Sequence, residues 1–224
     1  MGDKSWAKYW NTDLSREEFD KLCAEWYTRK YMIDCRYSAS KYGNENTDNK
    51  TANDINQLYP GMKILVGGCG CGGLVRGLDE LGATVRGFDI TVAINDHEHV
   101  HPSIYDLVVK ANILDEWEPK GAEVLVTCDV LEHLPQNLLP TVAENAFKYG
   151  IKKMYHAIGS GETLEHAAGD GNIGHITYKP MQWWIDLFKP YYKHVPYPPD
   201  QIYKTRRWPT DAVPGVLLFE LNDA

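Results

Sequence analysis

Residues 64–73 read Ile-Leu-Val-Gly-Gly-Cys-Gly-Cys-Gly-Gly, a short apolar run that leads into a cluster of glycines. An apolar run of this length that is bounded by glycines is typical of a buried parallel strand. Glycines between a strand and a helix let the backbone turn sharply and come close to a ligand at the helix N-terminus. We therefore predict a strand, a tight turn and a helix, with a ligand site at the turn.

The glycines alone fit more than one ligand. Gly68, Gly70 and Gly73 match the G-x-G-x-x-G pattern of dinucleotide sites, whereas Gly68, Gly70 and Gly72 match the G-x-G-x-G pattern of S-adenosylmethionine sites. A tight turn that binds no ligand is the third interpretation. The position of the glycines, after a predicted strand and before a predicted helix, favours a ligand site.

Asp89 ends the strand that follows. A carboxylate at this strand end can accept hydrogen bonds from both ribose hydroxyls of an adenosine. The alternative is an ordinary turn residue at a strand end. Taken together with the glycines, Asp89 predicts an adenosine-bearing cofactor across the carboxyl ends of the first strands, but it does not identify that cofactor.

Short apolar strands alternate with helices along the rest of the chain. We predict strands at 63–66, 84–89, 122–127, 153–158 and 215–221, and helices at 74–81, 138–147 and 181–188. This alternation is typical of βαβ units, so the predicted fold class is α/β with a doubly wound, mostly parallel sheet. The length of the chain and the lack of an evident linker predict a single domain over residues 1–224.

The first part of the chain is expected to form a helical extension. Ser15 and Glu18 form a capping box, in which each side chain can bond the backbone N–H of the other, and apolar residues follow three or four apart. Residues 43–56 are polar and rich in Asn, which predicts an exposed or mobile loop. We therefore divide the domain into an N-terminal extension and loop, residues 1–58, and an α/β core, residues 59–224.

The composition limits the partners and the compartment. The formal net charge of −8 argues against tight, unselective binding of nucleic acid, although Lys204, Arg206 and Arg207 form a small basic patch. The five cysteines are an odd number without a Cys-x-x-Cys pair, which suits free thiols in a reducing compartment. No apolar run approaches the ~20 residues that span a bilayer, and no apolar segment near the start indicates a secretory signal. We therefore expect a cytoplasmic protein that does not bind the membrane.

Residues 129–135 read Asp-Val-Leu-Glu-His-Leu-Pro and come directly after the strand predicted at 122–127. The order of glycine loop, acidic strand end and this segment resembles the class I S-adenosylmethionine-dependent methyltransferases, in the branch with small-molecule substrates, over about residues 62–188. The resemblance implies a seven-stranded, Rossmann-like sheet and S-adenosyl-L-methionine as the cofactor. It also implies methyl transfer to an O or N atom of a small molecule or a saccharide.

Three other functions stay open at this point. A methyltransferase of nucleic acid or nucleotides would use the small basic patch, but the chain lacks the Asn/Asp-Pro-Pro-Tyr/Phe segment that marks amino methylation of bases. A non-catalytic protein that binds the cofactor is supported only by Val66, where the family usually has an acidic residue. A nicotinamide-dependent reductase would share the glycines and Asp89 but leaves residues 129–135 unexplained.

The resemblance also implies the cofactor-binding residues. The glycine loop would wrap the methionine part of the cofactor, Asp89 would hold the ribose, and Asn112 would reach the adenine amino group. The backbone N–H of Ile113 would meet the adenine ring, and the carbonyl of Cys128 would bind the methionine ammonium. Val66 is a departure from the family pattern, because it cannot bind that ammonium by hydrogen bonds. The implied cofactor-binding residues are therefore Gly68, Cys69, Gly70, Gly72, Asp89, Asn112, Ile113 and Cys128.

Two histidines are the candidate catalytic residues. A base is needed only when the acceptor must lose a proton, and an imidazole, with an unperturbed pKa of about 6.5, is the usual choice. His133 follows the end of a strand at the crevice where ligands of such sheets bind, and in related methyltransferases a histidine at the place of His175 faces the acceptor. The alternatives are a helix-start residue for His133 and a loop-anchoring residue for His175.

The same region raises a metal site as a further alternative. Asp129, Glu132, His133 and His175 resemble the E-x-x-E-H…H site of methyltransferases in which a divalent ion holds a diol or a catechol. Two carboxylates and two imidazoles can bind such an ion. The Asp-x-x-Glu-His pattern also occurs in relatives without a metal, so the sequence assigns no metal ligand and names S-adenosyl-L-methionine alone as the cofactor.

Overall fold

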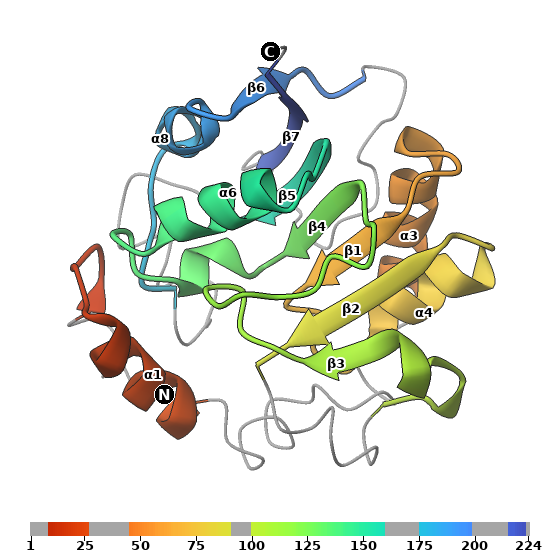
Figure 1. Ribbon diagram of the computed structural model, residues 1–224, viewed down its shortest axis with the longest axis horizontal. Helices are drawn as coiled ribbons and strands as arrows, with labels where there is room; N and C mark the ends of the chain where they lie inside the picture. Colours follow the sequence, from red (N-terminus) through yellow and green to blue (C-terminus); the bar gives the residue numbers. More distant parts are fainter. Residues whose placement is uncertain (1–8, 27–44, 91–99, 160–174, 199–214, 223–224) are drawn as a thin grey trace.

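The computed structural model describes residues 9–26, 45–90, 100–159, 175–198 and 215–222, and residues 45–49 by their backbone only. Its centre is a seven-stranded sheet with the strand order β3-β2-β1-β4-β5-β7-β6 (Figure 1). The strands are β1 (Ile64–Gly67), β2 (Val85–Asp89), β3 (Val108–Lys110), β4 (Val124–Cys128), β5 (Lys153–Ile158), β6 (Tyr192–Val195) and β7 (Gly215–Leu221).

The sheet is mostly parallel. β1 pairs in parallel with β2 on one side and with β4 on the other, and β3 and β5 continue the parallel order outward. β7 is antiparallel to both β5 and β6. The predicted doubly wound, mostly parallel seven-stranded sheet is therefore confirmed. Because the strand order reverses between β1 and β4, the carboxyl ends of these two strands flank the crevice where open α/β sheets bind ligands.

Helices cover both faces of the sheet (Figure 1). α3 and α4 lie on one face, and α6 and α8 lie on the other. α1 lies on the side toward which the arrowheads of β1 and β4 point. The helices are α1 (Arg16–Trp26), α3 (Glu45–Leu58), α4 (Gly73–Glu80), α6 (Leu139–Lys148) and α8 (Met181–Phe188), with 3-10 helices η2 (Pro102–Leu107) and η3 (Leu131–His133).

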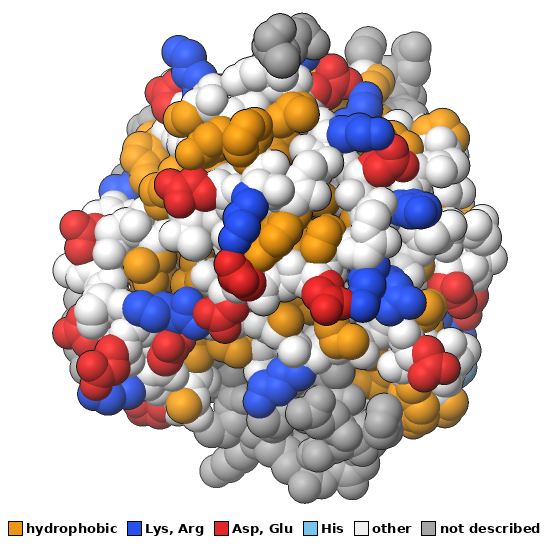
Figure 2. All heavy atoms as spheres, viewed as in Figure 1, with side chains coloured by type: hydrophobic (Ala, Val, Ile, Leu, Met, Phe, Trp, Pro, Cys, Tyr) orange, Lys and Arg blue, Asp and Glu red, His pale blue; other side chains and the backbone are white. Residues whose placement is uncertain are grey.

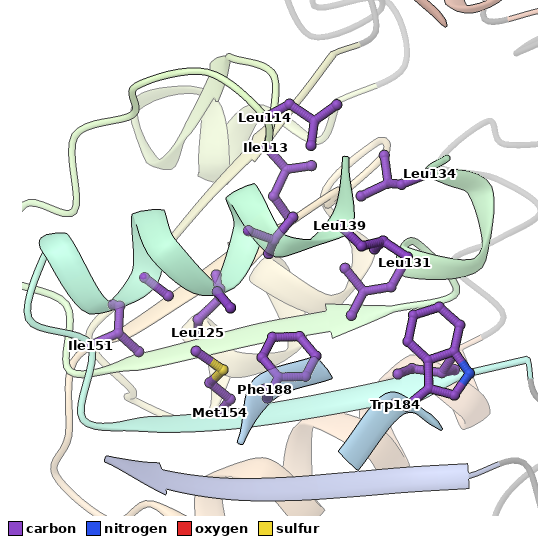
Figure 3. Close-up of a cluster of buried hydrophobic side chains, with 14 of the residues drawn as sticks. Ile113, Leu114, Leu125, Leu131, Leu134, Leu139, Ile151, Met154, Trp184 and Phe188 are labelled. Atoms are coloured by element: carbon purple, nitrogen blue, oxygen red, sulfur yellow. The ribbon is translucent and has the colours of Figure 1, made fainter. Parts of the chain in front are cut away.

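The two faces of the sheet carry two separate hydrophobic clusters. Successive side chains of a strand point to opposite faces, so Val124 and Val126 of β4 pack toward α3 and α4, while Leu125 packs toward α6 and α8. Figure 3 shows Leu125 and Met154 beneath α6 and beside Phe188 of α8. All five side chains are at most a few per cent exposed, so the central strands are buried on both sides as parallel strands require.

The loop predicted over residues 43–56 is wrong from residue 45 onward, because residues 45–58 form α3. Ala52, Ile55 and Tyr59 recur at helical spacing and are buried against the sheet, while Asn53 and Gln57 are exposed. The many polar residues occupy the outer side of an amphipathic helix. A polar composition therefore concealed a narrow apolar stripe, which is the feature that forms the helix.

Candidate functional site

The glycine loop connects β1 to α4 with three residues in the left-handed backbone region. The φ angles of Gly68, Gly70 and Gly72 are 69°, 55° and 83°. For residues other than glycine, this backbone conformation costs about 1–2 kcal/mol per residue. The predicted turn between a strand and a helix is therefore present, with Gly72 directly before the first residue of α4.

The surroundings of these glycines differ. A Cβ atom added to Gly68 would lie 2.4 Å from a methyl of Val130, and one added to Gly72 would lie 2.4 Å from the Cδ1 of Ile104. A Cβ atom on Gly70 would meet no described atom within 4 Å. The lack of a side chain at Gly68 and Gly72 thus lets Val130 and Ile104 pack against the loop. The space beside Gly70 can instead take a ligand that approaches the backbone closely.

Asp89 lies against this loop. The backbone N–H of Gly70 donates a hydrogen bond of 2.8 Å to the Asp89 carboxylate, and the N–H of Cys69 donates one of 3.0 Å to the carbonyl of Phe88. Both bonds tie the loop to the end of β2. The carboxylate that was predicted to hold a ribose therefore lies next to the glycine that has open space around it.

The thiols of the loop are poor nucleophiles. Burial is the main cause that raises the pKa of Cys71 to about 11, and it raises the pKa of Cys69 well above its ordinary value. The negative charge of Asp89 acts in the same direction on both thiols. Since the thiolate is the nucleophilic form, these cysteines line the site without offering covalent catalysis at neutral pH.

Asn112 begins a tight turn at the same edge of the sheet. Its side-chain oxygen accepts a hydrogen bond of 3.0 Å from the N–H of Leu114, and the N–H of Ala111 donates one of 2.9 Å to the carbonyl of Asp89. An amide oxygen has two lone pairs, so this one can accept from a further donor as well. Ile113 is buried in this turn, next to the end of β2.

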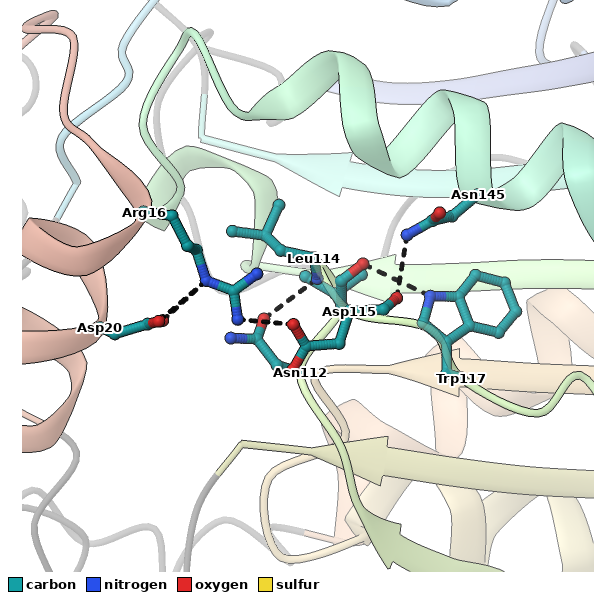
Figure 4. Close-up of polar contacts among 8 residues, drawn as sticks. Arg16, Asp20, Asn112, Leu114, Asp115, Trp117 and Asn145 are labelled. Carbon is teal, nitrogen blue, oxygen red and sulfur yellow. Dashed lines mark hydrogen bonds and ion pairs between the residues drawn. The ribbon is translucent and has the colours of Figure 1, made fainter.

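The turn after Asn112 is held from two other elements, as Figure 4 shows. Arg16 of α1 donates a hydrogen bond of 2.6 Å to the Asp115 carboxylate, and Asn145 of α6 donates one of 2.9 Å to the Asp115 carbonyl. The indole N–H of Trp117 donates to the carbonyl of Ile113 at 3.3 Å. These contacts fix the backbone at the position where the resemblance places the adenine.

The end of β4 makes an unusual turn. Cys128 is half-buried at the strand end, and Asp129 has a φ of 54°. A left-handed backbone is uncommon for a residue with a side chain, although Asp tolerates it better than most. The N–H of Asp129 donates a hydrogen bond of 2.9 Å to the carbonyl of Ala157. The turn directs the chain away from the sheet and into η3.

His133 and His175 lie together, which the sequence alone could not show. Their ring centroids are 4.7 Å apart, and the ring planes meet at 83°. His175 is only 4% exposed, and neither of its ring nitrogens has a hydrogen-bond partner among the described residues. The alternative of a loop-anchoring hydrogen bond is therefore not seen for His175. His133 ends η3 rather than beginning a helix.

Glu132 is the third member of this group. It is fully buried, and one of its carboxylate oxygens accepts a hydrogen bond of 2.8 Å from the N–H of Gly159. The same oxygen lies 3.9 Å from the Nε2 of His175. Burial lowers the pKa of His175, and the charge of Asp129 opposes this shift in part. Burial therefore favours the neutral imidazole, whose unprotonated nitrogen can accept a proton or bind a ligand.

Backbone contacts hold the segment that carries His175. The N–H of Thr177 donates to the carbonyl of Glu132 at 3.0 Å, and the Thr177 hydroxyl donates to the carbonyl of Leu134 at 2.6 Å. Asn11 binds the other side of the segment, since its side chain exchanges two hydrogen bonds with the backbone of Tyr178. The segment is thus fixed between η3 and the N-terminal part of the chain.

Several residues of the site were not predicted from the sequence. Val130 fills the space beside Gly68, Ile104 fills the space beside Gly72, and Gly159 donates to Glu132. Val130 lies in the segment 129–135 and Gly159 begins a glycine-rich stretch, which were their only signals, whereas Ile104 had none. Val66 is buried in the cluster on the α3 and α4 face of the sheet, against which Cys69 of the loop also packs. The basic patch at Lys204, Arg206 and Arg207 lies outside the described residues.

No protein-family model matches the chain, and no curated protein matches it. Solved structures do match. The 1,6-didemethyltoxoflavin-N1-methyltransferase of Burkholderia thailandensis, with bound 1,6-didemethyltoxoflavin and S-adenosylhomocysteine, has a TM-score of 0.65 and 11% identity over 95% of this chain and 92% of that one. The magnesium protoporphyrin IX methyltransferase of Synechocystis PCC 6803, with bound S-adenosylhomocysteine, has a TM-score of 0.60 and 13% identity over 90% and 98%.

A third solved structure, the CcbJ methyltransferase of Streptomyces caelestis, has a TM-score of 0.57 and 16% identity over 80% of this chain and 90% of that one. At these identities the comparison concerns the arrangement of strands and helices, and it covers most of each chain. The strand order and the antiparallel β7 agree with the seven-stranded sheet that the resemblance implied. The chain has the fold of the class I S-adenosylmethionine-dependent methyltransferases.

Proposed function

We propose that the protein is an S-adenosylmethionine-dependent methyltransferase that acts on an O or N atom of a small molecule or a saccharide. The observation that carries this proposal is the hydrogen bond between the Gly70 N–H and the Asp89 carboxylate at the carboxyl edge of the sheet, where no described atom crowds Gly70. This arrangement presents a backbone without side chains and a carboxylate to one ligand, as an adenosine-bearing cofactor requires.

The similar structures support this choice of cofactor and acceptor. Two of them contain S-adenosylhomocysteine, and one also contains its small-molecule acceptor. When bound, the cofactor supplies a methyl group on a sulfonium: an acceptor lone pair forms the new bond to the methyl carbon, and the electrons of the C–S bond stay on sulfur. The residues of this chain then have to align the acceptor, exclude water and receive the proton that the acceptor loses.

His133 and His175 are the proposed catalytic residues. His133 ends η3, shortly after β4. The segment that carries His175 is held beside η3 by the hydrogen bonds of Thr177 to the carbonyls of Glu132 and Leu134. The ring nitrogens of the buried His175 have no hydrogen-bond partner among the described residues. Its imidazole can therefore accept a proton from an acceptor hydroxyl or amine. We propose that the pair acts on the acceptor and that the loop glycines and Asp89 act on the cofactor.

A nucleic-acid acceptor is the second candidate, and the described surface does not favour it. Figure 2 shows Lys and Arg side chains interspersed with Asp and Glu on the face it presents, without a continuous basic stripe. Tight binding of a polyanion depends on many contacts between Lys or Arg and phosphate, which a net charge of −8 opposes. A methyl-donor assay with labelled S-adenosylmethionine, run against metabolites, oligosaccharides and RNA, distinguishes the two acceptor classes.

Cofactor choice is tested by thermal-shift measurements with S-adenosylhomocysteine, NAD and NADP. We expect stabilisation by S-adenosylhomocysteine alone. Asp89→Ala removes a charged hydrogen-bond acceptor and is expected to weaken the binding of S-adenosylhomocysteine about 10- to 100-fold. Asp79→Ala, an exposed Asp of α4, is the matched control and should bind normally. Stabilisation by NAD alone, or unchanged binding by the Asp89 variant, would contradict the proposed cofactor site.

The compartment is part of the proposal. The four cysteines within the described residues, Cys23, Cys69, Cys71 and Cys128, are all free thiols. Free thiols persist in a reducing compartment, which supports a cytoplasmic location. Among the helices described here, none has the length and apolar character needed to span a membrane.

A further inference from the structure

We propose that Glu132, His133 and His175 bind a divalent transition-metal cation. Each residue offers one ligand atom, and the three atoms all lie within 4.8 Å of one another. Bonds of about 2.0–2.2 Å from a metal to imidazole nitrogen and carboxylate oxygen bring ligand atoms to comparable separations with small side-chain movements. The sequence had left a metal site here as an alternative and assigned no ligand, because the Asp-x-x-Glu-His pattern also occurs in relatives without a metal.

The strongest support comes from His175. Its side chain is 4% exposed, and both ring nitrogens lack a hydrogen-bond partner among the described residues. Leaving a buried polar group unsatisfied costs about 1–3 kcal/mol, so such a group in a folded protein calls for a partner such as a water molecule or an ion. The Oε1 atom of Glu132 lies 3.9 Å from the Nε2 atom, which is too far for a hydrogen bond but suitable for a shared cation.

Gly159 provides the second support. A Cβ atom at this position would lie 3.0 Å from the Oε1 of Glu132 and 3.1 Å from the Cε1 of His175. The backbone of Gly159 is not left-handed, so its conformation does not demand glycine. The missing side chain instead leaves room beside the ligand atoms. Its N–H also orients the Glu132 carboxylate, as residues that support metal ligands do.

The donor set indicates which cations fit. Two imidazoles and one carboxylate suit Zn²⁺, Mn²⁺, Co²⁺ or Fe²⁺, whereas Mg²⁺ prefers sites made of oxygen atoms and water. The carboxylate of Asp129 acts electrostatically on His175, so a second negative charge lies close enough to favour a cation. Three protein ligands also leave at least one coordination position open, as in catalytic rather than structural metal sites.

The open position gives the cation a role that rests on the proposed function. An acceptor oxygen bound there would lose its proton more readily, because a divalent cation lowers the pKa of a coordinated hydroxyl. The histidines would then act on the acceptor through the metal. This predicts an oxygen acceptor.

The test is calorimetric titration of the full chain, after dialysis against a chelator, with Mn²⁺, Co²⁺, Zn²⁺ and Mg²⁺. We expect one transition-metal ion per chain and weaker binding of Mg²⁺. His175→Gln and His133→Gln should each weaken Co²⁺ binding by at least about tenfold and change its visible absorption. His194→Gln, which changes an exposed histidine of β6, is the control and should bind as the wild type does.

Glu132→Gln keeps an oxygen that can accept the Gly159 N–H, so it is expected to fold and still lose cation affinity. The proposal fails if no transition metal binds the wild type at one per chain, or if both histidine variants bind as tightly as the wild type. Binding of S-adenosylhomocysteine is measured on the same samples. Cofactor binding without cation binding would refute the metal site alone, and cation binding without cofactor binding would refute the proposed function alone.

Discussion

Gly68 and Gly70 share a left-handed backbone but face different neighbours. Their φ angles are 69° and 55°, so an alanine at either position carries a similar strain of about 1–2 kcal/mol. A methyl at position 68 would also overlap Val130, whose branched side chain moves little, whereas a methyl at position 70 would meet no described atom within 4 Å. This difference separates the role of the loop in folding from its role in binding.

We therefore predict that Gly68→Ala loses more stability than Gly70→Ala, by about 1–3 kcal/mol of overpacking. Gly70→Ala should stay folded and yet bind S-adenosylhomocysteine poorly, because its methyl occupies the ligand space. Urea denaturation and calorimetry measure the two effects. Normal binding by a folded Gly70→Ala would show that this glycine does not face the cofactor.

His156 is a buried histidine outside the candidate site. It lies in β5, its Nδ1 is 2.8 Å from the Thr127 hydroxyl, and its ring stacks on Phe188. Burial lowers its pKa to about 3. In the unfolded chain a histidine takes up a proton at about pH 6.5, so protonation favours unfolding between these two values.

The stability contributed by the neutral form of His156 is thus present above about pH 6.5 and is lost as the pH falls toward 3, by about 1.4 kcal/mol per pH unit. His156→Gln removes this titration and should flatten the fall in unfolding free energy between pH 7 and pH 5. His101→Gln is the control at a more exposed position. Equal pH slopes for the His156 variant and the wild type would contradict the assignment.

At the scale of elements, strands with strong apolar runs were predictable. The strands expected at 153–158 and 215–221 are β5 and β7 with the same bounds, and the helix expected at 181–188 is α8. β3 and β6 were not predicted individually. They have only three and four residues, and each has a single buried side chain, so neither shows an apolar run in the sequence. Tertiary pairing rather than local pattern forms these edge strands.

The site was predictable only in part for a related reason. The glycine loop, Asp89 and the end of β4 meet because parallel neighbouring strands end at one edge, which the alternating pattern implies. The contact between His133 and His175 depends on how a distant segment folds back onto η3. The resemblance to an E-x-x-E-H…H metal site had grouped these residues only as an alternative. No local pattern encodes the return of the chain, so the structure was needed to show their proximity.

The helix α3 offers a direct test of an element that the sequence concealed. Ile55 is fully buried against the sheet, and Gln57 is exposed on the same helix. Ile55→Ala should lower the unfolding free energy by about 2–5 kcal/mol, while Gln57→Ala should change it by less than about 0.5 kcal/mol. Urea denaturation measures both. Equal, small effects would mean that residues 45–58 do not pack as this helix.

At the scale of the whole molecule, the N-terminal part of the chain joins elements that line the site. Asn137 exchanges two hydrogen bonds with the backbone of Leu14, and Arg16 binds Asp115 in the turn beyond Asn112. Leu14 itself packs in the cluster beneath α6. Contacts of α1 therefore reach the turn proposed for adenine, while Asn11 reaches the segment that carries His175.

These links predict that the N-terminal contacts affect ligand binding more than folding. The ion pair of Arg16 is exposed and contributes little to stability, about 0–1 kcal/mol. Arg16→Ala should leave the unfolding free energy nearly unchanged and weaken S-adenosylhomocysteine binding a few-fold, because the turn after Asn112 loses a support. Lys21→Ala, which removes an exposed ion pair within α1, should change neither quantity.

The proposed function depends most on the cofactor lying across the carboxyl ends of β1, β2 and β4. A crystal structure with S-adenosylhomocysteine tests this directly. We predict the ribose hydroxyls on the Asp89 carboxylate, the adenine beside Asn112, and the amino-acid part of the ligand along Gly70. Density for the ligand elsewhere, or none at that edge at saturating concentration, would contradict the central claim.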